Sequence, residues 1–158
     1  MSKTPVTKLG EQLLRDELQH LKHVERPSVI TAISEARAQG DLSENADYDA
    51  AKEKQGFVEG RIIELESKLS NAQVIDPTTL DADGRVVFGA TVLLEDLDNS
   101  SEVRYQIVGD DEADIKVSKI SISSPIARAL IGKSAGDVAQ VQAPSGVREY
   151  EIIDVLYV

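Results

Sequence analysis

The chain has neither cysteine nor tryptophan, and two phenylalanines and four tyrosines are its only aromatic residues. The absence of cysteine excludes disulfide scaffolds, thiol nucleophiles and cysteine-ligated zinc sites, and it fits a reducing compartment such as the cytosol. The shortage of aromatic side chains argues against a protein that reads single-stranded nucleic acid by stacking bases on aromatic rings.

Positive charge is also scarce, with 17 Lys and Arg against 28 Asp and Glu and a net charge of −11 at pH 7. Binding naked nucleic acid through bulk charge needs a surplus of cations that neutralise phosphates, so that class of function is excluded. No apolar run approaches the ~20 residues of a bilayer span, and residues 1–5 lack the apolar segment of a secretory signal. We therefore expect a soluble cytoplasmic protein with no membrane partner.

The character of the sequence changes near residues 76–84. Helical periodicity dominates the segment before this point, and short β-rich runs follow it. The intervening stretch is rich in Asp, Thr, Pro and Gly, which favour turns and end helices. We predict an α+β protein with an antiparallel coiled-coil hairpin at 1–76, a linker at 77–84 and a small antiparallel β-sheet domain with one helix at 85–158.

Apolar residues spaced by three and four predict two long helices that pack through a heptad seam. The seam of the second helix is Tyr48, Ala51, Gln55, Val58, Ile62, Leu65, Leu69 and Ala72. The seam of the first helix is Leu14, Leu18, Leu21, Val29, Ile33 and Ala36. This first seam shifts phase near Pro27, which predicts a local kink or an inserted turn there.

The connection between the two helices, residues 39–45, is so short that the helices must be antiparallel neighbours. Gly40 is suited to end the first helix in a left-handed conformation, and either Asp41 or Ser43 is suited to cap the second. A first helix over residues 9–39 would be ~45 Å long at ~1.5 Å per residue. The pattern predicts a rod with a narrow tip.

Charged residues concentrate at this tip: Arg37, Asp41, Glu44, Asp47, Asp49, Lys52 and Lys54. One interpretation is a solvated loop whose acids favour the start of a helix and whose bases are ordinary surface partners. The other starts from Asp41 and Glu44, whose spacing on a tight turn lets both carboxylates point off the end of the rod. Two carboxylates alone bind Mg²⁺ weakly, so such a tip would need a partner to complete the coordination.

Six strand-like runs are predicted in the second part: Val86–Phe88, Thr91–Leu94, Val103–Val108, Lys116–Ile122, Val138–Gln142 and Arg148–Val155. A short helix is predicted after Ser124, because Ser suits its N-cap, Pro125 suits its first position and Gly132 suits the residue past its end. One helix packed on a small antiparallel sheet is the natural arrangement of such elements.

Three further features allow a structural interpretation. His20 and His23 lie three residues apart, but a metal site needs converging ligands, so we interpret them as surface residues. Gly56 and Gly60 each cost a helix ~1 kcal/mol relative to Ala, which suggests close packing against the first helix or the second domain. The acidic run 110–114 is either a solvated loop or part of a docking surface.

Four stretches resemble the bacterial Gre transcript cleavage factors: residues 37–48 (RAQGDLSENADY), 55–62 (QGFVEGRI), 107–114 (IVGDDEAD) and 123–133 (SSPIARALIGK). The resemblance covers nearly the whole chain. The GDLSENADY stretch carries it most specifically, because heptad seams alone occur in many unrelated proteins.

The resemblance implies a C-terminal domain similar in fold to FK506-binding proteins. This domain would dock at the rim of the secondary channel of backtracked bacterial RNA polymerase through Ser124, Pro125, Ile126 and Ala127. The hairpin would enter the channel and reach the polymerase active site and the 3′ end of the backtracked RNA. The protein would stimulate the polymerase's own RNA cleavage in trans, as a monomer and without being an enzyme itself.

The same resemblance implies roles for the tip residues. Asp41 would help to hold a second Mg²⁺ that Asp41 and Glu44 share with the polymerase and that the isolated chain does not bind tightly. Glu44 would orient or deprotonate the attacking water, as in two-metal phosphodiester hydrolysis. Arg37 and Lys52 would face the extruded RNA, where cations steer phosphates; solvation of the helix surface is their alternative interpretation.

Three other functions compete with this one. A prolyl isomerase would need an aromatic-lined pocket, and the second domain offers only Phe88, Tyr105, Tyr150 and Tyr157. A channel-binding inhibitor of polymerase would not be expected to keep Asp41, Leu42 and Glu44 in the activating pattern. A passive coiled-coil adaptor would have no reason to leave acids at an unpaired tip.

Overall fold

The computed structural model describes residues 3–158, which form two units. The first unit spans residues 11–72, and the second consists of residues 3–10 together with 73–158. The helical elements that build the first unit are α1 (Lys8–His20), the π-helical turn η1 (Leu21–Glu25), α2 (Arg26–Arg37), the 3₁₀ turn η2 (Leu42–Glu44) and α3 (Ala46–Ser70).

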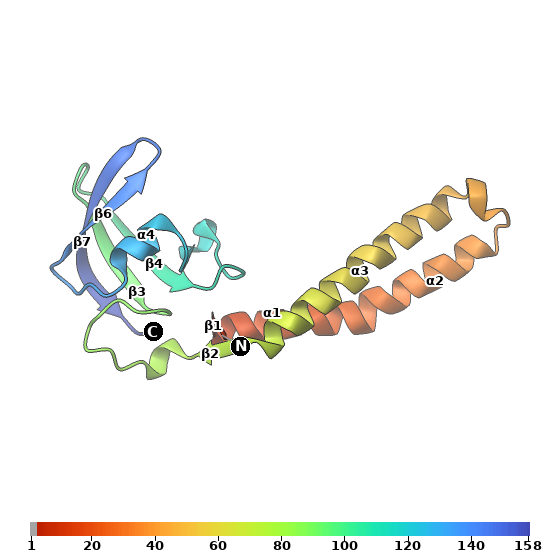
Figure 1. Ribbon diagram of the computed structural model, residues 1–158, viewed down its shortest axis with the longest axis horizontal. Helices are drawn as coiled ribbons and strands as arrows, with labels where there is room; N and C mark the ends of the chain where they lie inside the picture. The colour runs from red at the N-terminus through yellow and green to blue at the C-terminus, as the bar shows by residue number, and fades with distance from the viewer. Residues whose placement is uncertain (1–2) are drawn as a thin grey trace. The chain divides into compact units, whose positions relative to one another are not determined.

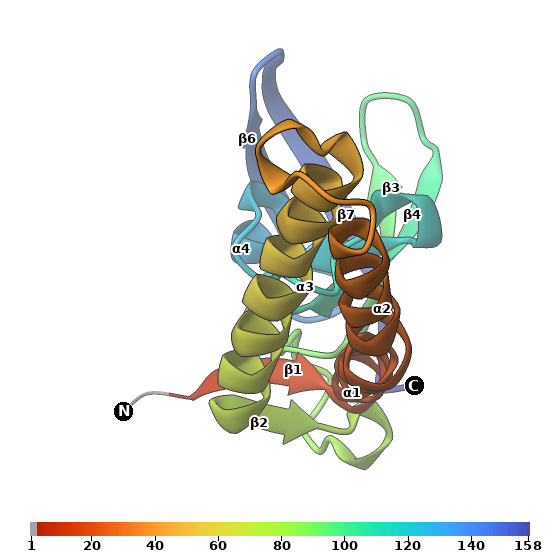
Figure 2. The same ribbon diagram turned by 90° about the vertical axis from the view of Figure 1, so that its right-hand side faces the viewer.

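The first unit is the predicted antiparallel hairpin, in which α2 and α3 lie side by side (Figures 1 and 2). Their facing seam is apolar because the heptad positions of both helices point inward. The buried seam residues are Leu14, Val29, Ile33, Ala36, Ala51, Val58, Ile62 and Leu65. The predicted seam is confirmed except at its end, where α3 stops at Ser70 and Ala72 belongs to a strand.

The predicted irregularity near Pro27 is a π-turn directly before it. The N–H of Arg26 bonds the carbonyl of Leu21, five residues back, instead of the carbonyl four back. Pro27 lacks an N–H and its ring clashes with the carbonyl four residues earlier, so a widened turn relieves the conflict. The extra residue in this turn also explains the phase shift between Leu21 and Val29.

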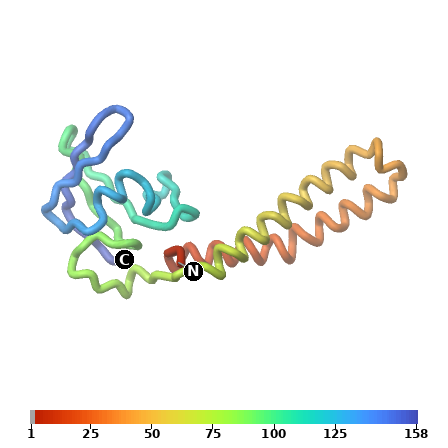
Figure 3. Tube along the Cα trace, in the orientation of Figure 1, coloured from red at the N-terminus to blue at the C-terminus, as the bar shows by residue number. Residues whose placement is uncertain are grey.

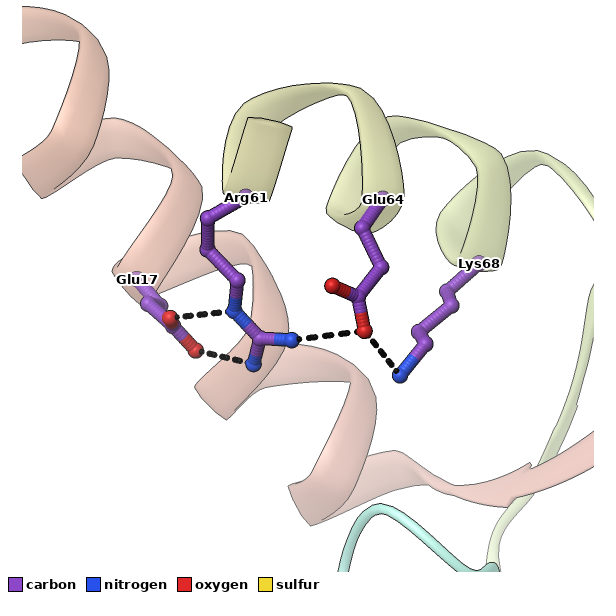
Figure 4. A network of polar contacts seen from close by, with 4 residues as sticks. All are labelled: Glu17, Arg61, Glu64 and Lys68. Carbon is purple, nitrogen blue, oxygen red and sulfur yellow. Dashed lines mark hydrogen bonds and ion pairs between the residues drawn. The ribbon is translucent and has the colours of Figure 1, made fainter. Parts of the chain in front are cut away.

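Ion pairs hold the two sides of the hairpin together along its length. Arg61 on α3 donates two hydrogen bonds to Glu17 on α1, of 2.7 and 2.9 Å, and a third of 3.0 Å to Glu64 (Figure 4). Lys68 pairs with the same Glu64 oxygen at 2.9 Å. Because the guanidinium bonds it directly, the pKa of Glu17 is held below its ordinary value.

The interpretation of Gly56 and Gly60 as positions of close packing against the first helix is wrong. Apart from the adjoining residues and the neighbouring backbone of α3 itself, a Cβ built at either residue would meet no atom of the described hairpin within 4 Å. Both glycines lie on the exposed side of α3, next to Phe57, which is 71% exposed. The packing of the hairpin therefore does not account for them.

The second unit is built on a curled five-stranded sheet with strand order β5-β4-β3-β7-β6 (Figure 1). The strands are β3 (Thr91–Asp96), β4 (Glu102–Val108), β5 (Lys119–Ser121), β6 (Val138–Ala143) and β7 (Gly146–Leu156). The other elements are β1 (Thr4–Thr7), β2 (Ala72–Ile75), the 3₁₀ turns η3 (Pro77–Thr79) and η4 (Ile115–Val117), and the helix α4 (Pro125–Leu130).

Three details of this sheet differ from the prediction. Residues 86–88 form no strand, although the backbone of Val86 bonds Lys133 and Gly132. The predicted strand 116–122 divides into η4 and the short β5, because Ser118 takes a positive φ of 60° between them. β5 pairs with β4 in parallel, so the sheet is not wholly antiparallel.

The core of the second unit lies between the sheet and α4. It contains Val86, Val92, Leu94, Ile107, Ile120, Ala127, Leu130, Ala139 and Ile152, all buried. The predicted helix signals are confirmed: the Ser124 hydroxyl accepts from the Ala127 N–H at 3.2 Å, Pro125 opens α4, and Gly132 has a positive φ of 86°.

Residues 3–10 group with the second unit rather than with the hairpin, contrary to the predicted boundary. The Glu112 carboxylate explains this, because it accepts hydrogen bonds from the Thr7 N–H, the Thr7 hydroxyl and the Gly109 N–H. A Cβ on Gly10 would overlap the same carboxylate. A side chain distant in sequence thus fixes the segment that begins α1.

No helix within residues 3–158 is both long and apolar enough to cross a lipid bilayer.

Candidate functional site

The hairpin tip is the loop that joins the end of α2 to the start of α3 (Figure 3). Gly40 closes α2 as predicted: it has a positive φ of 113°, and its N–H bonds the carbonyl of Arg37 at 3.2 Å. A side chain at such a φ is strained, whereas glycine adopts it freely. The chain then enters η2, which carries Asp41 at its start and Glu44 at its end.

Asp41 is exposed, and Ser43 holds it in place. Its Oδ1 accepts from the Ser43 N–H at 2.9 Å and from the Ser43 hydroxyl at 2.8 Å. These two bonds, the one from the hydroxyl foremost, keep the pKa of Asp41 below its ordinary value. The carboxylate is therefore ionised at neutral pH, with Oδ2 free of hydrogen bonds to any residue in 3–158.

Glu44 is exposed, and its carboxylate makes no hydrogen bond or ion pair within the described part of the chain. Asp41, Glu44 and Asp47 line one open hollow at the tip, together with Gln39, Asn45 and Ala46. The structure thus brings the two predicted tip carboxylates to the same hollow, open to solvent at the turn of the hairpin.

The tip has the right donors for a hard cation but too few of them. Carboxylate oxygens suit Mg²⁺, which prefers about six oxygen ligands in near-octahedral geometry. Within residues 3–158, no three His, Cys, Asp or Glu side chains are close enough together to hold a metal ion. The oxygen donors of the tip are therefore of the type that Mg²⁺ prefers, but the tip alone does not complete its coordination.

Asn45 caps α3, so the prediction of Asp41 or Ser43 as its cap is wrong. The Asn45 Oδ1 accepts from the Tyr48 N–H at 3.0 Å, and the backbone of Asn45 is extended with φ −100° and ψ 98°. Asp41 instead caps η2, since the 3₁₀ turn intervenes between the two helices. An Asn directly before the first helical residue is a recognised N-cap signal, and sequence reasoning passed over it.

The basic residues beside the tip occupy two kinds of position. Arg37 lies over the Tyr48 ring, with its Cζ 6.0 Å from the ring centroid, and Lys52 donates to Gln55 at 3.1 Å. Both are exposed. Lys54, in contrast, pairs with Glu25 across the hairpin at 3.3 Å, which makes it part of the stem.

The predicted docking residues 124–127 divide by burial. Ala127 is fully buried in the core, and Ile126 is partly buried against it. Ser124 is half-buried and uses its hydroxyl to cap α4, whereas Pro125 is exposed. Pro125, with parts of Ser124 and Ile126, is the surface this segment offers.

Several of the remaining candidate residues have structural partners. In the acidic run, Asp110 accepts from Ser121 and Ser123, and Asp114 caps η4. His20 and His23 are exposed, and the His20 Nε2 lies 3.3 Å from the Glu25 Oε1.

The hollow beside α4 is lined by Arg128, Ala129, Lys133, Val138, Gln140 and Glu149, none of them aromatic. That lining does not suit a prolyl isomerase.

Comparisons with known proteins agree along the entire chain. Residues 4–74 match the family described as "Transcription elongation factor, N-terminal", and residues 81–157 match "Transcription elongation factor, GreA/GreB, C-term". The chain is 71% identical over 157 residues to "Transcription elongation factor GreA" of Ralstonia nicotianae, covering 99% of both chains. It is 65% identical over 158 residues to the protein of the same name from Neisseria meningitidis serogroup A, covering 100% of both.

Among solved structures, the chain is similar to "Crystal structure of GreA factor homolog 1 (Gfh1) protein of Thermus thermophilus". The identity is 28%, the TM-score is 0.44, and the match covers 97% of this chain and 98% of that one. The assignment rests on the sequence matches, which span both units. The chain belongs to the GreA/GreB family of transcription elongation factors.

Proposed function

We propose that this chain binds backtracked bacterial RNA polymerase through the secondary channel and stimulates the polymerase's own cleavage of RNA near its 3′ end. The hairpin delivers the tip carboxylates, and the polymerase supplies the rest of the reaction centre. The protein acts in the cytoplasm as a monomeric accessory factor, and it is not a nuclease by itself.

The observation that carries the proposal is the state of the two tip acids. Asp41 and Glu44 line the same open hollow, and neither pairs with a cation of the described residues. Elsewhere on the hairpin, acids such as Glu17 and Glu59 pair with arginines of the opposite side. Carboxylates left unpaired in an incomplete ligand set suit a second protein that contributes the missing ligands.

Asp41 would help to hold a weakly bound Mg²⁺ shared with the polymerase, through the oxygen that Ser43 leaves free. When bound, such an ion stabilises the charge on the attacking and leaving oxygens of a phosphodiester. Glu44, which has no internal partner, would orient the attacking water and accept its proton.

Docking would use the exposed Pro125 and its neighbours Ser124 and Ile126 on the second unit. Arg37 and Lys52 are exposed on the flanks of the tip, where their charge would steer the phosphates of the extruded RNA 3′ end. Because docking and chemistry lie on different units, they should be separable by mutation.

The test is single-turnover RNA cleavage in a purified, backtracked polymerase complex with Mg²⁺. Adding the parent protein should release short 3′ RNA fragments. Asp41→Asn and Glu44→Gln should each lower the stimulated rate about a hundredfold at concentrations where both variants still compete with the parent for polymerase. Ser124→Ala with Pro125→Ala should instead raise the concentration of factor that gives half-maximal stimulation.

A second arm omits polymerase and mixes the purified protein with the same RNA and Mg²⁺. No cleavage is expected there. Cleavage that tracks with the pure protein would overturn the accessory role, and full stimulation by both tip variants would overturn the roles of Asp41 and Glu44.

A further inference from the structure

We infer that Asn45 is a positioning residue for the tip carboxylates, because its amide ties the end of α2 to the start of α3. The inference rests on the proposed function of Asp41 and Glu44. Asn45 itself is half-buried and touches neither carboxylate through any hydrogen bond of the described residues. Its effect on cleavage would therefore pass through the shape of the loop.

The Asn45 side chain makes one bond to each helix. Its Nδ2 donates to the carbonyl of Ala36 in the last turn of α2 at 2.7 Å, and its Oδ1 accepts from the Tyr48 N–H in the first turn of α3 at 3.0 Å. The last carbonyls and the first N–H groups of helices have no partner within their own helix. One amide thus pairs the otherwise unpaired Tyr48 N–H at the start of α3 and adds a second, side-chain donor to the Ala36 carbonyl, which also accepts from the Gln39 N–H at 3.2 Å.

The presence of Asn rather than Asp or Ser at position 45 points to the bond with α2. Asp and Ser cap helices about as well as Asn does, and the helix dipole would favour the negative charge of Asp. Only Asn among these carries both an acceptor and an N–H donor. The bond from Nδ2 to Ala36 is what Asn45 adds to an ordinary cap.

The position of this bond matters for the acids. The loop between Ala36 and Asn45 contains both Asp41 and Glu44, so the bond fixes the distance between the loop's two ends. Glu44 directly precedes Asn45 in the chain. The position of the Asn45 backbone therefore determines where the Glu44 side chain points. Ser43 orients only the Asp41 carboxylate. Asn45 instead holds the whole turn in position relative to the ends of α2 and α3.

Two variants separate the bonds. Asn45→Asp keeps the size and the cap acceptor but replaces the N–H donor with an oxygen facing the Ala36 carbonyl. Asn45→Ser keeps a cap acceptor without adding charge and is too short to reach Ala36. Asn71→Asp is the matched control, since Asn71 ends the same helix and its Nδ2 donates to the Ser67 carbonyl at 3.0 Å.

The first measurement needs no polymerase. In the parent protein, NMR hydrogen exchange should show a protected Asn45 side-chain amide proton. In Asn45→Asp and Asn45→Ser, the backbone order parameters of residues 40–44 should fall, while those of the stem stay unchanged. An Asn45 amide in the parent that exchanges like that of an exposed asparagine would overturn the inference, whether or not the variants fold.

The second measurement is single-turnover cleavage in the backtracked complex. Both Asn45 variants should lower the maximal rate about tenfold or more, because small misplacements of catalytic groups cost that much. The concentration of factor for half-maximal rate should be unchanged, and Asn71→Asp should match the parent. A merely structural role would instead raise that concentration by reducing the fraction of folded factor.

A double variant separates this inference from the proposed function. Adding Asn45→Asp to Glu44→Gln should cause little further loss of rate, because Asn45 acts through the acids. Parent-like cleavage by the Asn45 variants, with Asp41→Asn and Glu44→Gln inactive, would overturn the inference alone. Parent-like cleavage by all of these variants would overturn the proposed function of the tip acids.

Discussion

The stem and the tip of the hairpin use acidic residues in opposite ways. In the stem, Glu17 and Glu59 each accept two hydrogen bonds from an arginine across the hairpin. At the tip, Asp41 is held only by Ser43, and Glu44 is held by no side chain of residues 3–158. Stem acids therefore contribute to stability, and tip acids are left available to another molecule.

The largest expected effect comes from comparing the same Glu→Gln substitution at the tip and in the stem. Glu44→Gln should lower stimulated RNA cleavage about a hundredfold, the scale of losing a general base, with the melting temperature unchanged. Glu17→Gln should do the reverse, lowering the melting temperature while leaving cleavage at 25 °C near the parent rate. Paired circular dichroism melts and cleavage assays measure both, and a Glu17→Gln variant as inactive as Glu44→Gln would erase the contrast.

The stem network predicts a smaller, salt-dependent effect on stability. Arg61→Met removes two bonds to Glu17 and one to Glu64, and the side chains of Arg61, Glu17 and Glu64 are 34%, 41% and 50% exposed. Screening by solvent and salt limits the loss in unfolding free energy to about 1 kcal/mol. Urea unfolding at low salt and at 1 M salt should show the loss shrinking as salt rises.

The same substitution predicts a pH dependence. The pKa of Glu17 is lowered in the folded state, so the pair stabilises the fold above the unfolded pKa of Glu17. This stability is lost as pH falls through the lowered folded pKa. The difference in unfolding free energy between parent and Arg61→Met should therefore be present at pH 7 and vanish in acid. A constant difference at every pH would contradict the ionic origin.

Replacing a stem glycine and the tip glycine by alanine should change stability in opposite directions. Gly56→Ala on the exposed side of the stem should raise the unfolding free energy by up to about 1 kcal/mol, because the new methyl meets open space. Gly40→Ala at the tip should lower it, since φ there is 113°. Urea unfolding measures both, and a destabilised Gly56→Ala would show that a helical glycine is needed at that position.

The smallest effect concerns the hydroxyl beside Asp41. Ser43→Ala removes the bond from the hydroxyl and keeps the bond from the backbone N–H, so the pKa of Asp41 should rise toward its ordinary value without reaching it. An NMR titration of the Asp41 carboxyl carbon measures this change. An unchanged pKa would mean that the hydroxyl does not hold the carboxylate.

Features set by neighbouring residues were predictable from the sequence. The heptad seams, the end of α2 at Gly40 and the signals around α4 each depend on contacts within one or two turns. The exposed position of Asp41 and Glu44 followed from the short connection between two amphipathic helices. In these places local preference and final structure agree.

Features set by distant residues were not predictable in the same way. The bonds from Thr7 to Glu112 span most of the chain, and they are what place residues 3–10 with the second unit. The parallel pairing of β5 with β4 depends on the path of residues 109–118, whereas alternation along a strand carries no direction. The bond of Asn45 to Ala36 likewise depends on the closed hairpin. The capping bond of Asn45 to Tyr48 is local and could have been predicted, but the predicted cap was Asp41 or Ser43 instead.

The central claim, that the tip lends carboxylates to a metal site in another protein, is tested most directly by a Mg²⁺ titration of RNA cleavage in the backtracked complex. Saturating parent protein should lower the Mg²⁺ concentration that gives half-maximal cleavage, and Asp41→Asn at equal occupancy should leave it at the value of polymerase alone. An equal Mg²⁺ requirement with and without the parent protein would contradict the account.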